Sequence, residues 1–342
     1  MAAAFLVLAM ALPFAPAAPA APSRPAVGAR AGLLMDAGTG AVLWSREPHR
    51  PALVASTTKV LTALVAEAGY RPGQRLRVPE AAERVDGSRF GFQTGMVLTR
   101  EQLLTTLLAV SANDAAETLA AAYPGGRRGF VAAMQAKATE LGCTDSTWRD
   151  PSGLDTPGHR ASPADLAVLG RALLARPALA RIVASPTVAF RWPGGRRVVL
   201  TNHNKLVSQG KDPDAIGIKT GYTSKAGHTL VAAERRGGRT LVAVVLDADD
   251  IYADTRAMFA YGFATEVPAG TERLGQRPQS AQPIRAEPTV RPGAGPGLTV
   301  GAVPGGRPVP LPVAVGGGLG GVLVAGALVV KLARRRRYRP LH

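Results

Sequence analysis

Cysteine, aromatic residues and acidic charge are all scarce in this chain of 342 residues. The single cysteine, Cys143, excludes an intramolecular disulfide and a thiolate metal cluster, and we expect it to be a small buried residue at a helix end. The 24 acidic residues face 41 lysines and arginines, so the net charge is +17. Residues 271–342 hold 11 of the basic and 2 of the acidic residues, which leaves the remainder only mildly basic. The sequence has no nucleic-acid-binding motif, so we predict that the protein does not bind nucleic acid despite its positive charge.

The N-terminus also lacks charge before Arg24, and it is apolar from Phe5 to Leu12. Small residues follow at Ala18-Pro19-Ala20, where a signal peptidase could cleave. This pattern predicts a secretory signal peptide over residues 1–25, although a basic residue would usually precede the apolar run.

The C-terminal part of the chain lacks a periodic apolar pattern. Residues 268–312 contain 10 prolines and 8 glycines, which predicts a flexible or partly extended tether. Residues 313–330 are uncharged and are followed by Lys331 and a run of four arginines. We therefore predict a transmembrane helix over 313–333 and a basic cytoplasmic tail over 334–342. The protein would be a single-pass cell-membrane protein whose remaining residues lie on the extracellular side.

The segment between these ends, residues 26–267, has the patterns of one α+β domain. A hairpin is expected over 31–44, a block of helices between about residue 56 and residue 176, and three successive strands over 215–246 before a closing helix. Helix starts are marked by a capping box at Thr99 to Gln102 and by Ser162-Pro163. The order predicts one antiparallel sheet with strands from both ends of the domain, flanked by helices, and an inserted helical subdomain.

A polar stretch, Ala55-Ser56-Thr57-Thr58-Lys59, precedes the first apolar helix pattern. Residues three apart share a helix face, so Ser56 and Lys59 would point into one volume as a nucleophile and its base. Burial would lower the lysine pKa enough for it to accept a proton. Alternatively, Ser56 is a helix N-cap followed by a solvated lysine. Ser208 and Lys211 have the same spacing in a polar segment.

Two further polar stretches occur downstream. Ser111-Ala112-Asn113 lies between two helical patterns, where its side chains either face a cleft or cap a helix. Lys219-Thr220-Gly221 follows a strand pattern, and a glycine there would leave room for a ligand beside a cation and a hydroxyl. Taken alone, the second tripeptide could equally be a surface strand end.

Together the three motifs, Ser-x-x-Lys, Ser-x-Asn and Lys-Thr-Gly, resemble the active site of penicillin-binding proteins and serine β-lactamases. The resemblance is greatest to the low-molecular-weight D-alanyl-D-alanine carboxypeptidases and covers about residues 28 to 266. It includes the segment from Trp148 to His159 and the strands from Ile216 to Ala232. It implies a β-lactamase/transpeptidase-like fold and a hydrolase that needs no cofactor or metal. The implied partners are peptidoglycan stem peptides and β-lactam antibiotics.

The resemblance also implies roles for individual residues. Ser56 would be the acylated nucleophile, Lys59 its general base and Ser111 the proton relay to the leaving amine. The implied substrate-binding residues are Asn113, Lys219, Thr220, Gly221 and Tyr222. Among these, Lys219 and Thr220 would bind the terminal carboxylate, and the N–H groups of Ser56 and Tyr222 would form the oxyanion hole.

Two departures from the family limit what it implies. Its usual members carry a second β-rich domain and an amphipathic C-terminal anchor, whereas this chain continues into the predicted tether. The middle residue of Ser-x-Asn is Ala112, where glycine or aspartate is more usual in the family. Fine substrate preference, and the balance between carboxypeptidase, endopeptidase and transpeptidase reactions, therefore stay open.

Other functions fit the sequence less well. A class A β-lactamase needs a deacylating glutamate, but Glu117 and Glu140, the only glutamates between Ser111 and Lys219, lack the expected sequence context. A catalytically silent wall-binding protein would not need all the motif side chains. A metal hydrolase is disfavoured because the five histidines show no ligand spacing.

Overall fold

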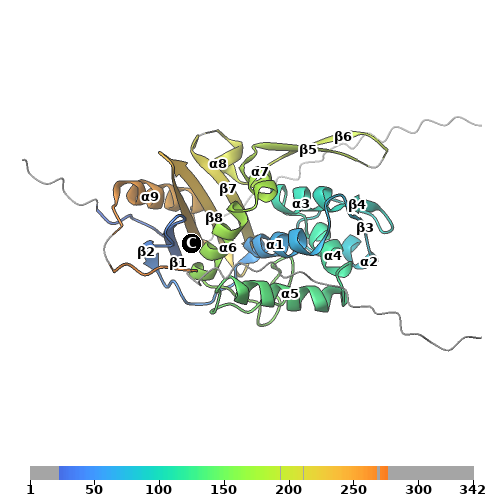
Figure 1. The fold of residues 1–342 in the computed structure, drawn as a ribbon, viewed down its shortest axis with the longest axis horizontal. Coiled ribbons are helices and arrows are strands. Elements are labelled where there is room, and N and C mark those ends of the chain that lie inside the picture. Colours follow the sequence, from blue (N-terminus) through green and yellow to red (C-terminus); the bar gives the residue numbers. More distant parts are fainter. Residues whose placement is uncertain (1–22, 193, 211, 268–269, 276–342) are drawn as a thin grey trace, which may run out of the picture. The chain divides into compact units, whose positions relative to one another are not determined.

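A five-stranded antiparallel sheet forms the centre of the domain in the computed structural model, which describes residues 23–192, 194–210, 212–267 and 270–275 (Figure 1). Its strand order is β2-β1-β9-β8-β7. The strands are β1 (Ala31–Asp36), β2 (Val42–Arg46), β7 (Ala215–Thr223), β8 (Gly227–Arg236) and β9 (Arg239–Ala248). Strands from the two ends of the domain thus pair directly, as the sequence predicts, because β1 lies beside β9.

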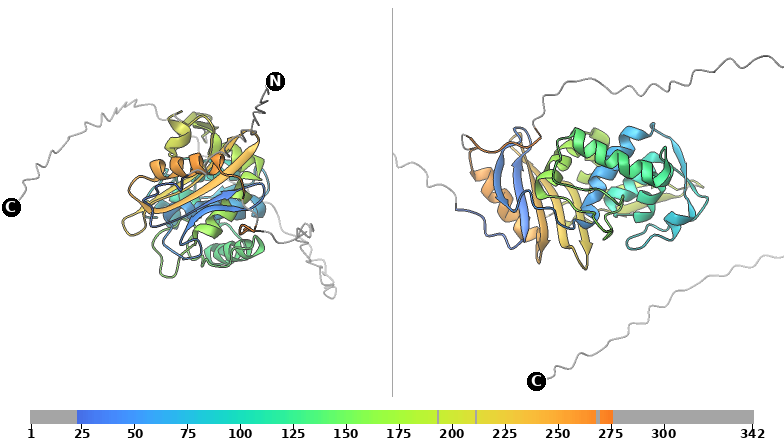
Figure 2. Two further views of the ribbon diagram at one scale, coloured as in Figure 1. Left: turned by 90° about the vertical axis from the view of Figure 1, so that its left-hand side faces the viewer. Right: turned by 90° about the horizontal axis from the view of Figure 1, so that it is seen from below.

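Both faces of this sheet are buried, and alternate side chains along each strand point to opposite faces. On β9, Leu241, Ala243 and Val245 pack with helix α9 (Ile251–Ala264). The intervening Val242 and Val244 pack on the other face, with the helical part of the domain. Figure 2 shows α9 covering one face of the sheet and the main block of helices on the other. The predicted α+β class, with helices inserted between β2 and β7, is confirmed.

The inserted residues form helices and two short antiparallel pairs of strands. The helical elements are η1 (Ala55–Thr58), α1 (Lys59–Gly69), α2 (Glu80–Glu83), α3 (Arg100–Ala109), α4 (Asn113–Ala121), α5 (Gly126–Glu140), α6 (Pro163–Leu174), α7 (Pro177–Ala184) and α8 (Lys205–Ser208). The strand pairs are β3 (Arg75–Arg77) with β4 (Val97–Thr99) and β5 (Thr187–Arg191) with β6 (Arg197–Thr201).

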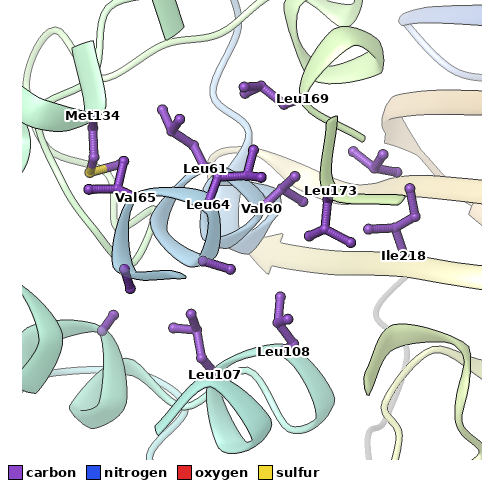
Figure 3. Close-up of a cluster of buried hydrophobic side chains, with 14 of the residues drawn as sticks. Val60, Leu61, Leu64, Val65, Leu107, Leu108, Met134, Leu169, Leu173 and Ile218 are labelled. Atoms are coloured by element: carbon purple, nitrogen blue, oxygen red, sulfur yellow. The ribbon is translucent and has the colours of Figure 1, made fainter. Parts of the chain in front are cut away.

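Helix α1 is buried on all sides, from Lys59 to Ala66. In Figure 3 its apolar side chains lie between Leu107 and Leu108 of α3 and Leu169 and Leu173 of α6. Burying a leucine side chain contributes about 2 kcal/mol, so this packing fixes the start of α1 firmly. The residue at that start is Lys59.

Local sequence signals located most elements correctly. The capping box at Thr99 and the Ser162 cap both form, and α3 and α6 begin at the next residue. Cys143 is buried just after α5, as expected. The pair of short strands β3 and β4 lies within the block expected to be helical, and α7 was not expected.

The two predicted membrane segments, residues 1–25 and 313–333, fall wholly or almost wholly outside the described residues, as do the tail over 334–342 and most of the tether. Among the helices that the structure describes, none has the length and apolar character to span a bilayer. The signal peptide, the anchor and the boundary at residue 267 therefore stay predictions.

Residues 270–275, at the start of the predicted tether, return to the sheet. The Val42 N–H donates to the Glu272 carbonyl at 2.9 Å, and the Leu274 N–H donates to the Gly40 carbonyl at 2.9 Å. His49 adds a side-chain contact, because its Nε2 lies 3.0 Å from Glu272 Oε1 and its Nδ1 lies 2.9 Å from Asp145 Oδ2. These contacts lie at the β2 edge of the sheet.

Candidate active site

Ser56 lies in the short helical turn η1, immediately before α1. The Lys59 Nζ donates to Ser56 Oγ at 2.8 Å and to the Ser152 carbonyl at 2.6 Å. Ser56 is partly exposed whereas Lys59 is fully buried. Neither η1 nor α1 has a side-chain cap, so the alternative of Ser56 as a helix N-cap is wrong. The expected pair of nucleophile and base is in contact.

Burial and a neighbouring cation both act on Lys59. Burial, and then the charge of Lys219, hold the Lys59 pKa well below its usual value, against the opposing effects of Asp150, Asp114 and Glu117. A lowered pKa favours the neutral amine, which is the form that can take a proton from a hydroxyl. The geometry and electrostatics therefore suit Lys59 as a general base.

Strand β7 brings the Lys-Thr-Gly motif to the nucleophile. A Cβ atom at Gly221 would lie 2.8 Å from the Ser56 backbone nitrogen and 2.5 Å from Thr229 Oγ1. That Thr229 hydroxyl donates to the Val54 carbonyl at 3.0 Å and so joins the sheet to the residues before Ser56. A glycine is needed at 221 because two backbones approach closely there.

Lys219 is buried inside β7, so the alternative of a surface strand end is wrong. Its Nζ donates to the Thr220 carbonyl at 2.7 Å, and burial lowers its pKa to about 7. Thr220 is partly exposed. Tyr222 is 60% exposed, with its ring centroid 4.6 Å from that of His228.

Ser111 and Asn113 lie at the junction of α3 and α4. Ala112 is the N-cap of α4 and no side chain caps the helix, so neither Ser111 nor Asn113 has the alternative capping role. Ser111 is buried with a left-handed φ of 62°, a conformation that costs a non-glycine residue about 1 kcal/mol or more. Asn113 donates its Nδ2 to the Asp86 carbonyl at 2.6 Å, while its buried Oδ1 has no partner among the described residues.

The loop after Trp148 supplies groups that reasoning from the motifs missed. Asp150 Oδ1 accepts from the N–H groups of Ser152, Gly153 and Leu154 at 2.7–3.1 Å. Its Oδ2 accepts from Arg127 at 2.6 Å. Asp150 therefore fixes the Ser152 carbonyl that accepts from Lys59. The pattern Asp-x-Ser-Gly is a local signal for such a turn.

His159 supports the same loop. Its Nδ1 accepts from the Arg149 N–H at 3.0 Å, which leaves Nε2 to donate to Thr58 Oγ1 at 2.8 Å. Burial lowers the His159 pKa to about 4, so the ring is neutral near pH 7. A neutral ring suits this one-donor, one-acceptor arrangement between the loop and the start of α1.

The structure thus joins Ser56 directly to Lys59 and places Gly221 against Ser56. Lys219 is close enough to Lys59 for its charge to act on it. No hydrogen bond joins the Ser111 or Asn113 side chain to these groups within the described part of the chain. Ser208 ends α8, and Lys211, which has the same spacing from it as Lys59 has from Ser56, is outside the described residues.

Comparison with known proteins identifies the family to which the chain is similar. The family model for D-alanyl-D-alanine carboxypeptidases matches residues 18–250. A D-alanyl-D-alanine carboxypeptidase of Mycobacterium tuberculosis is 39% identical over 254 residues, which cover 72% of this chain and 86% of that protein. A D-alanyl-D-alanine endopeptidase of Pseudomonas aeruginosa is 35% identical, over 71% of this chain and 80% of that protein. The solved Streptomyces K15 DD-transpeptidase has a TM-score of 0.66 at 27% identity and covers 71% of this chain and 100% of its own.

The fold is that of the DD-transpeptidases and related penicillin-binding proteins. This likeness alone defines a structural class within which several reactions occur. The family match is narrower: the chain belongs to the D-alanyl-D-alanine carboxypeptidase family and is a serine-type hydrolase.

Proposed function

We propose that this enzyme removes the terminal D-alanine from peptidoglycan stem pentapeptides through an acyl-enzyme on Ser56. One observation carries the proposal: the fully buried Lys59 donates to Ser56 Oγ at 2.8 Å, and its pKa is lowered. A buried amine with a low pKa beside a partly exposed hydroxyl is the arrangement that activates a serine.

In the first half of the reaction, neutral Lys59 takes the Ser56 proton while Ser56 Oγ attacks the carbonyl carbon of the penultimate D-alanine. The tetrahedral intermediate then breaks its C–N bond. Lys59 returns the proton, through the Ser111 hydroxyl, to the leaving amine of the terminal D-alanine. The products are free D-alanine and an ester on Ser56, so protons and electrons balance.

Water completes the reaction. Lys59, neutral again, takes a proton from a water molecule as its oxygen attacks the ester carbon. The ester C–O bond then breaks, and the proton returns to Ser56 Oγ. The shortened stem peptide leaves as a carboxylic acid. A β-lactam would form the same ester but hold its leaving group in place, so we infer covalent penicillin binding at Ser56.

Substrate contacts follow from the positions of the remaining motif residues. Lys219 and Thr220 bind the terminal carboxylate, which needs a cation and a hydroxyl in this partly buried place. Asn113 Oδ1, which lacks a protein partner in the described structure, accepts an N–H of the peptide. The N–H groups of Ser56 and Tyr222 would form the oxyanion hole, and the close approach of residue 221 to the Ser56 nitrogen supports this role.

Residues outside the described structure complete the proposal. A signal peptide over 1–25 exports the chain, and a transmembrane helix over 313–333 holds it in the cell membrane with the catalytic domain on the cell-wall side. The part of the predicted tether that follows Gly275, which is where the chain leaves the sheet, would reach on the order of 35 Å as a flexible coil. That reach suits an enzyme that trims wall peptides.

Fluorescent penicillin tests the nucleophile. We expect covalent labelling of the wild type, loss of labelling in Ser56→Ala, and unchanged labelling in the control Ser208→Ala. Lys59→Arg keeps the charge but cannot lose a proton, so acylation should fall by orders of magnitude. Labelling that persists in Ser56→Ala would mean that another serine is the nucleophile.

The reaction itself is tested with a muramyl pentapeptide that ends in D-Ala-D-Ala. We expect the purified catalytic domain to release free D-alanine and leave the tetrapeptide. Cross-linked product in place of tetrapeptide would identify a transpeptidase, and cleavage only of cross-linked dimers would identify an endopeptidase. Either outcome would contradict the carboxypeptidase assignment.

Protease treatment tests the proposed topology. In intact wall-stripped cells, protease should release a domain that ends within the tether and leave a small C-terminal membrane fragment. Protection of the catalytic domain until lysis would show that the orientation is wrong. Membrane retention of a chain truncated at Pro268 would show that the anchor lies elsewhere.

A further inference from the structure

Arg127, in the first turn of α5, joins two buried carboxylates from different parts of the domain. Its Nε donates to Glu117 of α4 at 3.1 Å and 3.3 Å, one distance to each carboxylate oxygen. Its Nη2 donates to Asp150 Oδ2 at 2.6 Å. Glu117 and Asp150 are only 7% and 2% exposed, whereas the Arg127 side chain is 45% exposed. One arginine at the surface therefore serves two carboxylates that water scarcely reaches.

The stability of α5 does not explain this arginine. A cation in the first turn of a helix opposes the helix dipole. The first turn of α5 nevertheless contains Arg127 and Arg128 and no acidic residue. Arg128 is exposed and makes no ion pair or side-chain hydrogen bond with the residues that the structure describes. Of these two neighbours, only Arg127 contacts buried carboxylates.

The two carboxylates depend on Arg127 to different degrees. Asp150 also accepts from three backbone N–H groups, whereas Arg127 is the only hydrogen-bond partner of the Glu117 carboxylate within the described residues. A buried carboxylate without a partner is costly. Burial raises the pKa of Glu117, and the charge of Arg127 is the largest effect that opposes this rise. Arg127 therefore favours the charged form of Glu117.

Arg127 is also connected to Lys59 through the loop after Trp148. Asp150 binds Arg127 with one oxygen and the Ser152 N–H with the other, at 2.6 Å and 2.8 Å. The Ser152 carbonyl then accepts from Lys59 Nζ at 2.6 Å. The arginine thus reaches the general base through one side chain and one loop residue, and a shift of Arg127 would be transmitted to the acceptor of Lys59.

The charges that face Lys59 come from α4, from this loop and from β7. Three carboxylates favour the charged form of the amine, namely Asp114, Glu117 and Asp150. Lys219 of β7 opposes them, as burial does, and His159 is neutral near pH 7. Arg127 neutralises two of the three carboxylates. Without it, their uncompensated charge would favour the protonated form of Lys59, which cannot act as a base.

We propose that Arg127 is a positioning residue, which neutralises two carboxylates and holds the loop so that Lys59 can accept the Ser56 proton. The inference rests on the proposed function, because Arg127 acts through the general base. In the described structure Arg127 makes no hydrogen bond to Ser56 or Lys59, so its effect is indirect. A purely structural bridge would hold the same loop but would not set the pH at which Lys59 becomes active.

The pH profile of acylation tests this role in the full-length protein. The rate constant for labelling by fluorescent penicillin is measured from about pH 5 to pH 9, and its rising limb reports the deprotonation of Lys59. Arg127→Met keeps an unbranched side chain but removes the charge. We expect the midpoint to move up by roughly one pH unit, and acylation on the rising limb to fall about tenfold. Arg128→Met removes the neighbouring charge and should leave the profile unchanged.

Substitution of Glu117 gives results that structural damage would not. Glu117→Gln can still accept from Arg127 but loses a negative charge, so the midpoint should move to lower pH. In Arg127→Met combined with Glu117→Gln, one charge of each sign is absent, so the midpoint should return toward the wild-type value. Purely structural losses would instead accumulate in the double variant.

The outcomes distinguish this proposal from the proposed function. The positioning role would be overturned by a rate in Arg127→Met that falls equally at every pH, by an unmoved midpoint in Glu117→Gln, or by no recovery in the double variant. If Arg127→Met does not fold, as thermal unfolding would show, the direction of the shift in Glu117→Gln decides alone. Absence of Ser56 labelling in the wild type would reject the proposed function itself.

Discussion

Adding a methyl group at residue 221 should move strand β7, which carries Lys219, away from the turn that carries Ser56. In Gly221→Ala the new Cβ would lie 2.8 Å from the Ser56 nitrogen and 2.5 Å from Thr229 Oγ1, whereas ordinary contacts begin near 3.4 Å. Strand β7 or the turn η1 must therefore move by roughly 0.6–0.9 Å, the shortfall in those contacts. Overpacking of this kind costs about 1–3 kcal/mol of unfolding free energy. A misplacement approaching 1 Å costs about 100-fold in rate, so we expect acylation by fluorescent penicillin to slow by that factor.

Gly262→Ala is the matched control. Its Cβ would lie 2.5 Å from Leu34 and 2.8 Å from Leu241, on the face of the sheet covered by α9. Thermal unfolding should show a smaller loss of stability in Gly262→Ala, because the leucine methyl groups can move more easily than the Ser56 backbone, while the acylation rate of the folded protein falls only in Gly221→Ala. An acylation rate within about threefold of wild type in Gly221→Ala would refute the close fit between β7 and the nucleophile.

Three further predictions concern charged groups. Asp150→Asn weakens the turn that holds the Lys59 acceptor, so thermal unfolding should show a loss of about 2–3 kcal/mol and stopped-flow labelling a slower acylation. Burial sets the Lys219 pKa at about 7, and only the charged amine binds a carboxylate, so kcat/KM for a D-Ala-D-Ala peptide should fall as the pH rises through that value. The His49 pKa is raised, chiefly by its hydrogen bond to Asp145, with Glu272 adding to the effect. This stabilisation is complete below the unfolded imidazole pKa of about 6.5 and is lost as the pH rises through the higher folded value. Limited proteolysis at 270–275 should therefore be faster at pH 8 than at pH 6, and His49→Ala should remove the difference.

Elements with local signals were predictable from the sequence. The starts of α3 and α6 are determined by hydrogen bonds within four residues, at Thr99 and Ser162, so the sequence pattern is sufficient. Strands β3 and β4 have three residues each, with only Leu76 and Leu98 buried, which is too short for a period to be recognised. Their pairing depends on the surrounding domain.

The contacts of the candidate site that lie within one sequence motif were predictable. Spacing alone brings Ser56 to Lys59, because three residues make about one helical turn. The contact of Lys59 with the Ser152 carbonyl joins residues 93 apart in sequence. No pattern within one segment contains such a contact. The capping alternatives at Ser56 and Ser111 were also locally reasonable, and only the three-dimensional arrangement excludes them.

The return of residues 270–275 to the sheet bears on self-association. Edge strands with unpaired backbone groups can recruit the edge of another chain. Here the Val42 N–H and the Gly40 carbonyl are already paired with Glu272 and Leu274. A recombinant form cut at residue 267 would present these groups to other copies, so Gly275 is a safer boundary for concentrated protein than the end of α9.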